Sequence, residues 1–163
     1  METKNSFEDF LALSAVVTGF NTADLLGTGV GEQYYKELAT IAGGEITGEL
    51  LTTSRRILKR HRRDNEALER ALRHEILSSP KLGPVARNII KMWYLGQWFE
   101  LPPEWRGAYG NNPQDVDHMV SGEAYQESLV WLAAGSHPAG AKQPGYATWS
   151  LAPIQVKGKE QGG

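Results

Sequence analysis

The chain contains no cysteine, which excludes several kinds of chemistry together. Disulfides, thiolate metal sites, iron–sulfur ligation and thiol nucleophiles all need cysteine sulfur. Long apolar runs are also missing. No stretch approaches the roughly 18 residues that a membrane-spanning helix needs, so we expect no membrane span. The first residues lack a basic region followed by an apolar core, so we expect no export leader there.

An excess of charge of one sign is absent as well. The chain has 17 basic and 19 acidic residues, for a formal net charge of −2. No whole-protein field then favours nucleic acid or an anionic membrane, and we expect no nucleic-acid partner. The 163 residues fit a single domain over 1–163, which is long enough to bury a core without a disulfide or a metal.

Catalytic motifs are missing too. The four histidines, at 61, 74, 118 and 137, show no pairing at i and i+4 with an intervening glutamate, which excludes a zinc-binding helix. A serine nucleophile elbow is also absent. We therefore expect no catalytic residue, no cofactor site and no metal site in this chain.

Two local arrangements could still carry chemistry. Asp115 and Asp117 beside His118 could bind a cation, although helix capping or solvation is the favoured role for one short acidic pair. His137, before Pro138, could act as a general base, but a lone histidine without a positioned acid or nucleophile favours a structural role.

Glycines at 27, 29 and 31 suggest a phosphate-binding loop, but the surrounding pattern does not support one. No strand precedes them, no Lys-Ser/Thr pair follows, and the dinucleotide-binding spacing is wrong. We predict instead that a glycine here lets another element pack closely against the start of a helix.

The stretch around which the chain is organised is residues 88–98. Val85, Ile89 and Met92 repeat at i, i+4 and i+7, while Arg87 and Lys91 fall on the opposite side. A left-handed glycine at 96 would end the helix. This pattern predicts a central core helix, and an aromatic ledge that faces a partner is the alternative.

Similar periodicity predicts an all-α fold, a compact bundle of about five to six helices over residues 6–135. Besides the central helix, the expected helices cover residues 6–18 with Ser6 as N-cap, 33–42, 45–63, 64–77 with Asp64 as N-cap, and 122–134. Gly and Pro clusters predict an irregular but ordered covering loop near 98–120.

The C-terminal part has neither helical nor strand periodicity. Residues 136–153 combine prolines and glycines with Tyr146, Trp149 and Leu151. That composition predicts an extended arm that lies against another surface. The polar residues 154–163 are expected to form a frayed tail.

Six basic residues between positions 55 and 63 suggest a binding site for polyanions. On a helix they cover one broad face opposite the apolar side chains, so a packed helix with a solvated basic face explains the same pattern. A free-standing helical binding protein that recognises polyanions through 55–63 is the alternative function, and an acidic partner surface is a further possibility.

Three motif segments together resemble a known family. They are Phe10-Leu-Ala-Leu-Ser14 with Thr18-Gly19, Trp93-Tyr94-Leu95-Gly96, and His137-Pro-Ala-Gly-Ala-Lys-Gln-Pro-Gly-Tyr146 with Trp149. In this order they resemble the small (gamma) subunit of bacterial FAD-dependent sugar dehydrogenases, whose relatives serve sorbitol, fructose, glucose and gluconate dehydrogenases. The resemblance runs from about residue 7 to about 153.

The resemblance implies a non-catalytic, chaperone-like accessory subunit in a hetero-oligomer. Its partner would be a large flavoprotein of the glucose–methanol–choline type, which holds FAD, the catalytic base and the sugar site. In relatives the small subunit helps this partner to fold and to be exported, and a c-type cytochrome subunit often collects the electrons. Ala139 stands where a proline is common, and Tyr146 where a phenylalanine is common; both changes should keep the shape of the arm.

The resemblance implies a periplasmic or inner-membrane-associated complex, whereas Met1 as the native start would indicate the cytoplasm unless the flavoprotein carries its own signal. Large apolar interfaces are typical of obligate partners, and five tryptophans fit a surface that a partner covers. We predict that residues 98–110 and 136–153 supply much of the contact, through Trp98, Phe99, Trp105, Tyr109, His137, Pro138, Lys142, Pro144, Tyr146, Trp149 and Leu151.

Overall fold

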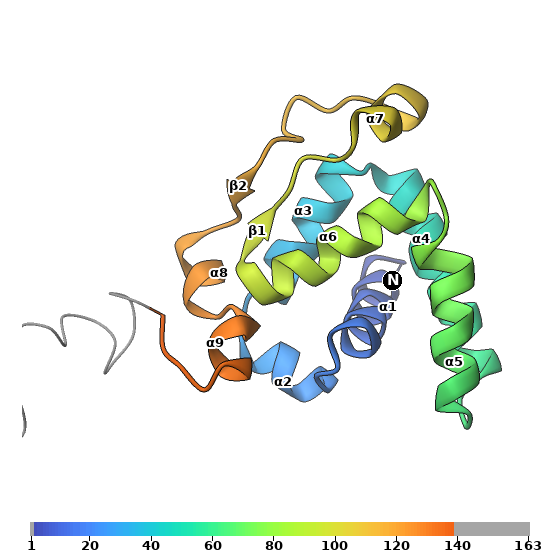
Figure 1. The fold of residues 1–163 in the computed structure, drawn as a ribbon, viewed down its shortest axis with the longest axis horizontal. Helices are drawn as coiled ribbons and strands as arrows, with labels where there is room; N and C mark the ends of the chain where they lie inside the picture. The colour runs from blue at the N-terminus through green and yellow to red at the C-terminus, as the bar shows by residue number, and fades with distance from the viewer. Residues whose placement is uncertain (1, 139–163) are drawn as a thin grey trace, which may run out of the picture.

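The computed structural model describes residues 2–138, with side chains from Asn5 onward, and it is mostly helical, as predicted (Figure 1). Its elements are α1 (Glu2–Thr18), α2 (Thr22–Gly27), α3 (Gly31–Ile41), α4 (Gly44–Arg60), α5 (Asn65–Leu72), the π-helical turn η1 (Arg73–Leu77), α6 (Leu82–Leu95), β1 (Gln97–Trp98), α7 (Pro103–Tyr109), β2 (His118–Met119), α8 (Gly122–Gln126) and α9 (Leu129–Ala133). No helix within residues 2–138 is both long and apolar enough to cross a membrane.

Helix α6 is the central helix, as its periodicity predicted. It packs against α1, α3, α4, η1, α8 and α9, and it crosses the middle of the molecule in Figure 1. Val85, Ile89 and Met92 are fully buried, whereas Arg87 and Lys91 are exposed. The core-helix interpretation is therefore confirmed, because the apolar stripe of α6 is covered by the other helices of the same chain.

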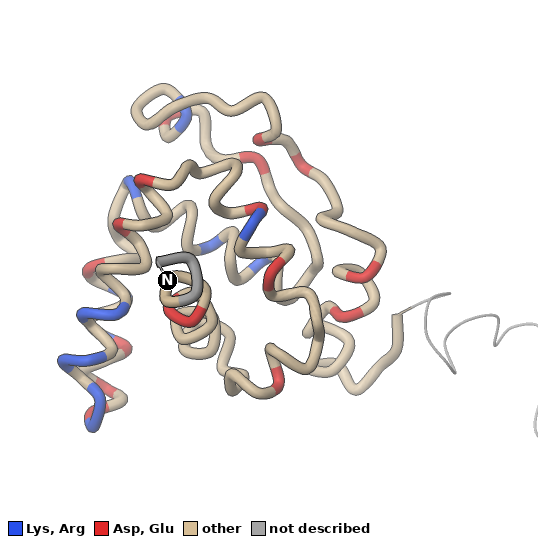
Figure 2. The backbone as a smooth tube through the Cα atoms, turned by 180° about the vertical axis from the view of Figure 1, so that it is seen from behind, with Lys and Arg blue, Asp and Glu red and all other residues tan. Residues whose placement is uncertain are grey.

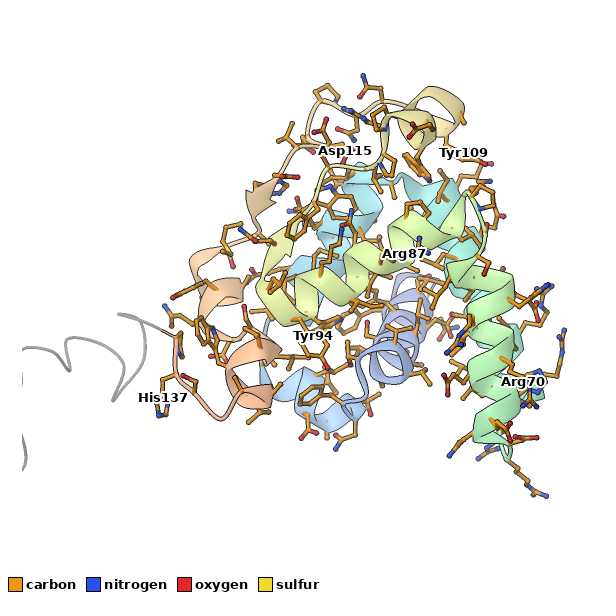
Figure 3. All side chains as sticks on the ribbon, viewed as in Figure 1. Arg70, Arg87, Tyr94, Tyr109, Asp115 and His137 are labelled. Carbon is orange, nitrogen blue, oxygen red and sulfur yellow. The ribbon has the colours of Figure 1, made fainter. Side chains whose placement is uncertain are left out.

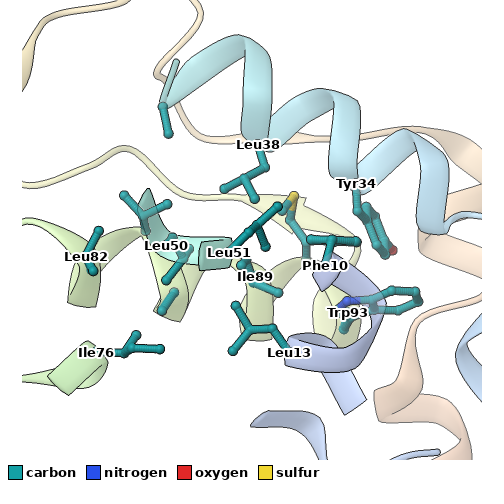
Figure 4. Close-up of a cluster of buried hydrophobic side chains, with 14 of the residues drawn as sticks. Phe10, Leu13, Tyr34, Leu38, Leu50, Leu51, Ile76, Leu82, Ile89 and Trp93 are labelled. Atoms are coloured by element: carbon teal, nitrogen blue, oxygen red, sulfur yellow. The ribbon is translucent and has the colours of Figure 1, made fainter. Parts of the chain in front are cut away.

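The hydrophobic core lies between α6 and the helices on either side of it. Figure 4 shows one row of buried side chains that come from α1, α3, α4, η1 and α6. Phe10 and Leu13 of α1 and Tyr34 and Leu38 of α3 are all fully buried. Gly31, the first residue of α3, confirms the predicted close packing, since a Cβ there would lie 3.4 Å from Phe7 and 3.5 Å from Trp93.

Helices α4 and α5 are neighbours in the fold. Asp64 is the N-cap of α5, as predicted, and its carboxylate accepts a hydrogen bond from the Ala67 amide at 2.9 Å. Helix α4 ends at Arg60 rather than at residue 63. Helix α5 continues into η1, where the amide of Ser78 donates to the carbonyl oxygen of Arg73 at 2.9 Å.

The expectation of an irregular loop near 98–120 was only partly right. Strands β1 and β2 form an antiparallel pair in which Gln97 lies opposite Met119 and Trp98 lies opposite His118. Helix α7 begins at Pro103, because proline suits the first helical position, where a backbone N–H has no partner in any case. In the sequence alone, the same prolines indicate turns.

Three other boundaries differ from the prediction. Helix α1 begins at Glu2, so Ser6 lies inside it and is not an N-cap. Helix α2 was not expected, and it starts where the side chain of Asn21 accepts from the Asp24 amide. The single helix predicted over 122–134 is two short helices, because the Ser128 hydroxyl donates to the carbonyl oxygen of Ala124 at 2.7 Å and the chain turns there.

Candidate interaction surface

The first two motif segments meet in space. The phenolic hydroxyl of Tyr94, at the end of α6, donates a hydrogen bond of 2.7 Å to the carbonyl oxygen of Thr18, at the end of α1. Thr18 in turn donates from its hydroxyl to the carbonyl oxygen of Ser14 at 2.7 Å. The rings of Tyr94 and Phe20 pack edge to face, with centroids 6.1 Å apart. Residues that are 76 positions apart thus form one contact.

An aromatic cluster lies just inside this contact. The ring of Trp93 packs against those of Phe10 and Tyr34, with centroid distances of 6.3 and 4.9 Å. Burial, with a smaller contribution from the carboxylate of Glu127, raises the pKa of the Tyr34 phenol, so this side chain stays neutral. The cluster fixes α1 and α3 against the second half of α6.

Gly96 brings α8 close to the end of α6. Its backbone φ is +69°, a left-handed conformation that glycine adopts easily. A Cβ at this position would lie only 2.6 Å from the carbonyl oxygen of Ala124, and the Gly96 carbonyl accepts from the Val120 amide at 2.9 Å. Only a residue without a side chain leaves α8 room to pack here.

A groove, here called the C-terminal groove, opens next to α9. Its volume is about 320 Å³, and it is lined by Asp24, Thr28, residues 126–129, Trp131, Leu132 and residues 136–138. Trp131 is held in place, since its indole N–H donates to the carbonyl oxygen of Tyr125 at 2.9 Å. Leu132 is 66% exposed, the largest exposed fraction among the large hydrophobic side chains described.

The beginning of the third motif segment forms one wall of this groove. His137 is exposed and Pro138 is buried. Figure 3 shows His137 at the outer end of the molecule, beyond α9. The remaining predicted contact residues of the arm lie outside the described residues; they are Lys142, Pro144, Tyr146, Trp149 and Leu151.

The predicted contact residues of the 98–110 segment divide into two groups. Trp98 is fully buried and Trp105 is 4% exposed, so neither indole lies on the surface of the described body. Tyr109 is 38% exposed and packs on Trp105 with a centroid distance of 5.5 Å. The half-buried Phe99 lies 4.7 Å from the ammonium nitrogen of Lys91, measured to the ring centroid. Phe99 and Tyr109 are therefore the members of this set that a partner could reach.

Trp98 is held by a buried carboxylate that sequence reasoning assigned to another role. Asp115 is 2% exposed, and its Oδ1 accepts from the Trp98 indole N–H at 2.8 Å and from the Leu101 amide at 3.0 Å. The expectation of capping or solvation was wrong for Asp115. The carboxylate closes the 97–121 segment over α6, because it supplies an acceptor to two buried donors.

Replacing Asp115 with alanine should loosen this segment. Two buried N–H donors would lose their acceptor, and at about 1–3 kcal/mol for each unsatisfied group we expect a loss of about 2–6 kcal/mol in the free energy of unfolding. Urea unfolding followed by tryptophan fluorescence measures it. The control is Asp117→Ala, which removes one exposed bond to the Glu100 amide and should lose about 1 kcal/mol. Equal losses would contradict this role of Asp115.

The histidine next to these aspartates joins β2 to α3. The Nε2 of His118 lies 2.6 Å from a carboxylate oxygen of Glu37, and its Nδ1 lies 2.7 Å from the carbonyl oxygen of Val116. The carboxylates of Asp115 and Asp117 accept from backbone or indole N–H groups instead of converging with His118. Within residues 2–138, no three potential metal-ligating side chains come together.

The Lys and Arg residues between 55 and 63 are all exposed, as the solvated-face interpretation predicts. Figure 2 marks the positions of basic residues along the α4–α5 pair in blue. Arg55 pairs with Asp9 at 3.3 Å, while Arg56 and Arg60 both pair with Glu75 at 2.9 and 3.2 Å. Internal ion pairs thus compensate half of the cluster, which weakens the case for a polyanion site across its whole length.

Sequence reasoning missed the contacts that fasten the 97–121 segment to the body. Besides Asp115, the side-chain amide of Asn88 donates to the carbonyl oxygen of Phe99 at 2.7 Å, and that of Asn112 donates to the carbonyl oxygen of Thr40 at 2.8 Å. One signal was available for Asn88, since a polar residue stood on the apolar side of α6.

Comparisons of the chain with protein-family models, with curated proteins and with solved structures each found no significant match.

Proposed function

We propose that this chain is a non-catalytic accessory subunit that binds, stabilises and helps to mature a large FAD-containing dehydrogenase acting on sugars or polyols. The flavin, the catalytic base and the sugar site belong to that partner, a flavoprotein of the glucose–methanol–choline type. This chain would supply a preformed surface on which the flavoprotein completes its folding and, as in the relatives it resembles, is exported.

One observation carries the proposal. Two motif segments that are far apart in the sequence are joined by the hydrogen bond from Tyr94, in the last turn of α6, to Thr18. Helix α9 also packs against α6. The third motif segment begins at His137, beside α9 and in the wall of the C-terminal groove. The motifs behind the resemblance thus surround one end of the molecule, which is expected if they serve a common interface.

The surface at this end suits a partner rather than a small substrate. Leu132 exposes 66% of its surface beside a groove, and the half-buried Trp131 is held rigidly by Tyr125. Aromatic and aliphatic anchors around a pocket are typical of the centres of protein interfaces. The arm that follows in the sequence contains Tyr146, Trp149 and Leu151.

A charge placed at Leu132 tests this interface. Leu132→Asp should lower the recovery of the complex with the co-expressed flavoprotein by at least about tenfold, because truncating an interface anchor weakens binding by about 2 kcal/mol or more. The melting temperature of the isolated chain should not fall, because the side chain is exposed. Affinity purification followed by dye-linked dehydrogenase activity measures the recovery.

The matched control is Val116→Asp, which adds the same charge at a side chain that is 51% exposed and follows Asp115, well away from α9 in Figure 3. It should leave recovery unchanged. Equal recovery with Leu132→Asp and Val116→Asp would argue against an interface at α9. The salt dependence of binding separates this function from polyanion recognition, which weakens steeply as salt rises.

A further inference from the structure

A second groove lies between α5 and the last turn of α1 with the residues that follow it. Its volume is about 510 Å³, which falls within the range of about 300–1,000 Å³ typical of binding clefts. The apolar lining consists of Ala15, Val16, Phe20, Leu68 and Leu72, and the polar lining of Asn21, Asn65 and Glu69, with Gly19 between them.

Four of the five apolar side chains of this α1–α5 groove are only partly covered, and the fifth, Leu72, is buried. Val16, Phe20 and Leu68 are half-buried at the edge of the core. Helix α5 is fastened mainly through α4 and through the π-helical turn η1 that follows it. Turns of this kind are frequent at functional sites. The groove therefore has apolar side chains from both α1 and α5 in its lining.

In the described part of the chain, three basic side chains without an ion pair lie close in sequence to Asn65 in the lining of the groove. The turn between α4 and α5 immediately precedes Asn65, a lining residue. Among the side chains of residues 5–138, the basic groups of Lys59, Arg62 and Arg63 form no ion pair, in contrast to Arg55, Arg56 and Arg60 earlier on α4. Figure 2 shows basic residues gathered at this free end of the α4–α5 pair. We name Lys59, Arg62 and Arg63 the basic turn.

We propose that the α1–α5 groove binds an amphipathic segment of a partner protein whose apolar face fills the groove and whose acidic end pairs with the basic turn. The apolar face of such a segment would contact the apolar side chains of the groove, and its acidic residues would pair with the basic turn. The proposal rests on this groove alone and does not depend on the function assigned to the C-terminal end.

Other occupants fit less well. The C-terminal residues 139–163 of this chain contain Lys142, Lys157 and Lys159 against a single acidic residue, Glu160, so they carry the same sign of charge as the basic turn. A nucleic acid would pair with the basic turn but has no row of aliphatic side chains to place against Val16, Phe20 and Leu68. An acidic, amphipathic protein segment satisfies both features.

Fluorescence anisotropy with the full chain and a pair of labelled peptides tests the proposal. Both peptides carry leucines at helical spacing on one face; one ends in a turn of glutamates and the other in a turn of lysines. We expect saturable binding of the glutamate peptide and at least about tenfold weaker binding of the lysine peptide, because like charges at an interface oppose binding. Exchanging Arg62 and Arg63 for glutamate should reverse that preference.

Substitutions in the groove test the apolar part of the binding. Leu68→Asp should weaken binding of the glutamate peptide at least about tenfold, since it removes an apolar contact and adds a like charge. The control Leu132→Asp, on the other groove, should leave this binding unchanged. Far-ultraviolet circular dichroism checks that each variant is folded, and the charge-exchange variant still decides the question if Leu68→Asp is not.

Two results would overturn the inference. One is the absence of saturable binding of either peptide up to about millimolar concentration, an affinity too weak to be specific. The other is binding that Leu68→Asp leaves unchanged and that a single-stranded oligonucleotide displaces, which would identify the basic turn as a polyanion site. Retained peptide binding with no complex formed with the flavoprotein would reject the proposed function but leave this inference standing.

Discussion

A chain that ends at Gly135 is expected to yield at least about tenfold less active dehydrogenase complex than the full chain when each is co-expressed with the flavoprotein. The deletion removes the wall of the C-terminal groove formed by residues 136–138, together with the aromatic residues of the arm. Obligate interfaces are large and apolar, so the loss of such a segment should weaken association more than any single substitution. Activity per amount of purified flavoprotein is the measurement.

A shorter deletion provides the control for this experiment. Removing only residues 154–163 leaves Trp149 and Leu151 in place and should preserve recovery of the complex. The isolated chain that ends at Gly135 should also keep its helical circular dichroism signal, because the helices α1 to α9 all end before residue 135. Unchanged recovery of active complex after the longer deletion would count decisively against a contact role for the arm.

Gly96→Ala is expected to lower the free energy of unfolding by about 3 kcal/mol. The left-handed backbone contributes about 1–2 kcal/mol of this loss, and the remainder comes from the new Cβ, which would lie 2.6 Å from the carbonyl oxygen of Ala124. For a chain of this size the melting temperature should fall by about 10 °C. Differential scanning calorimetry measures the shift.

Gly19→Ala is the matched control for that substitution. Gly19 has a similar φ of +79°, but an added Cβ there meets nothing within 4 Å. It should therefore show the backbone contribution alone, a loss of about 1–2 kcal/mol. If the two variants melt at the same temperature, the close approach of α8 to Gly96 contributes nothing to stability, and this part of the account fails.

The helical body was predictable where local signals and tertiary packing agree. The stripe of Val85, Ile89 and Met92 identified α6, and Asp64 identified the start of α5, because both signals act within a few residues of the chain. The division of the last helix was not predictable. It depends on a hydrogen bond from Ser128 and on the approach of Gly96, and the latter is a long-range contact that periodicity does not reveal.

The candidate surface was predictable only in outline. Aromatic content indicated that the rings of Trp98 and Trp105 must be covered, but not whether this chain or a partner covers them. The answer for Trp98 lies in Asp115, a carboxylate 17 positions away that looks like a surface residue in the sequence. A buried acid gives no local signal, because its partners are two N–H groups brought to it by folding.

The measurement that tests the central claim most directly is the stoichiometry of flavin in the purified complex. The affinity-tagged full chain is co-expressed with a large flavoprotein of the glucose–methanol–choline type, and size-exclusion chromatography is monitored for protein mass and for visible flavin absorption. The account predicts one peak that contains both chains, oxidised flavin and sugar or polyol dehydrogenase activity, and a colourless, inactive peak for this chain alone. A stable monomer that never elutes with a flavoprotein would contradict it.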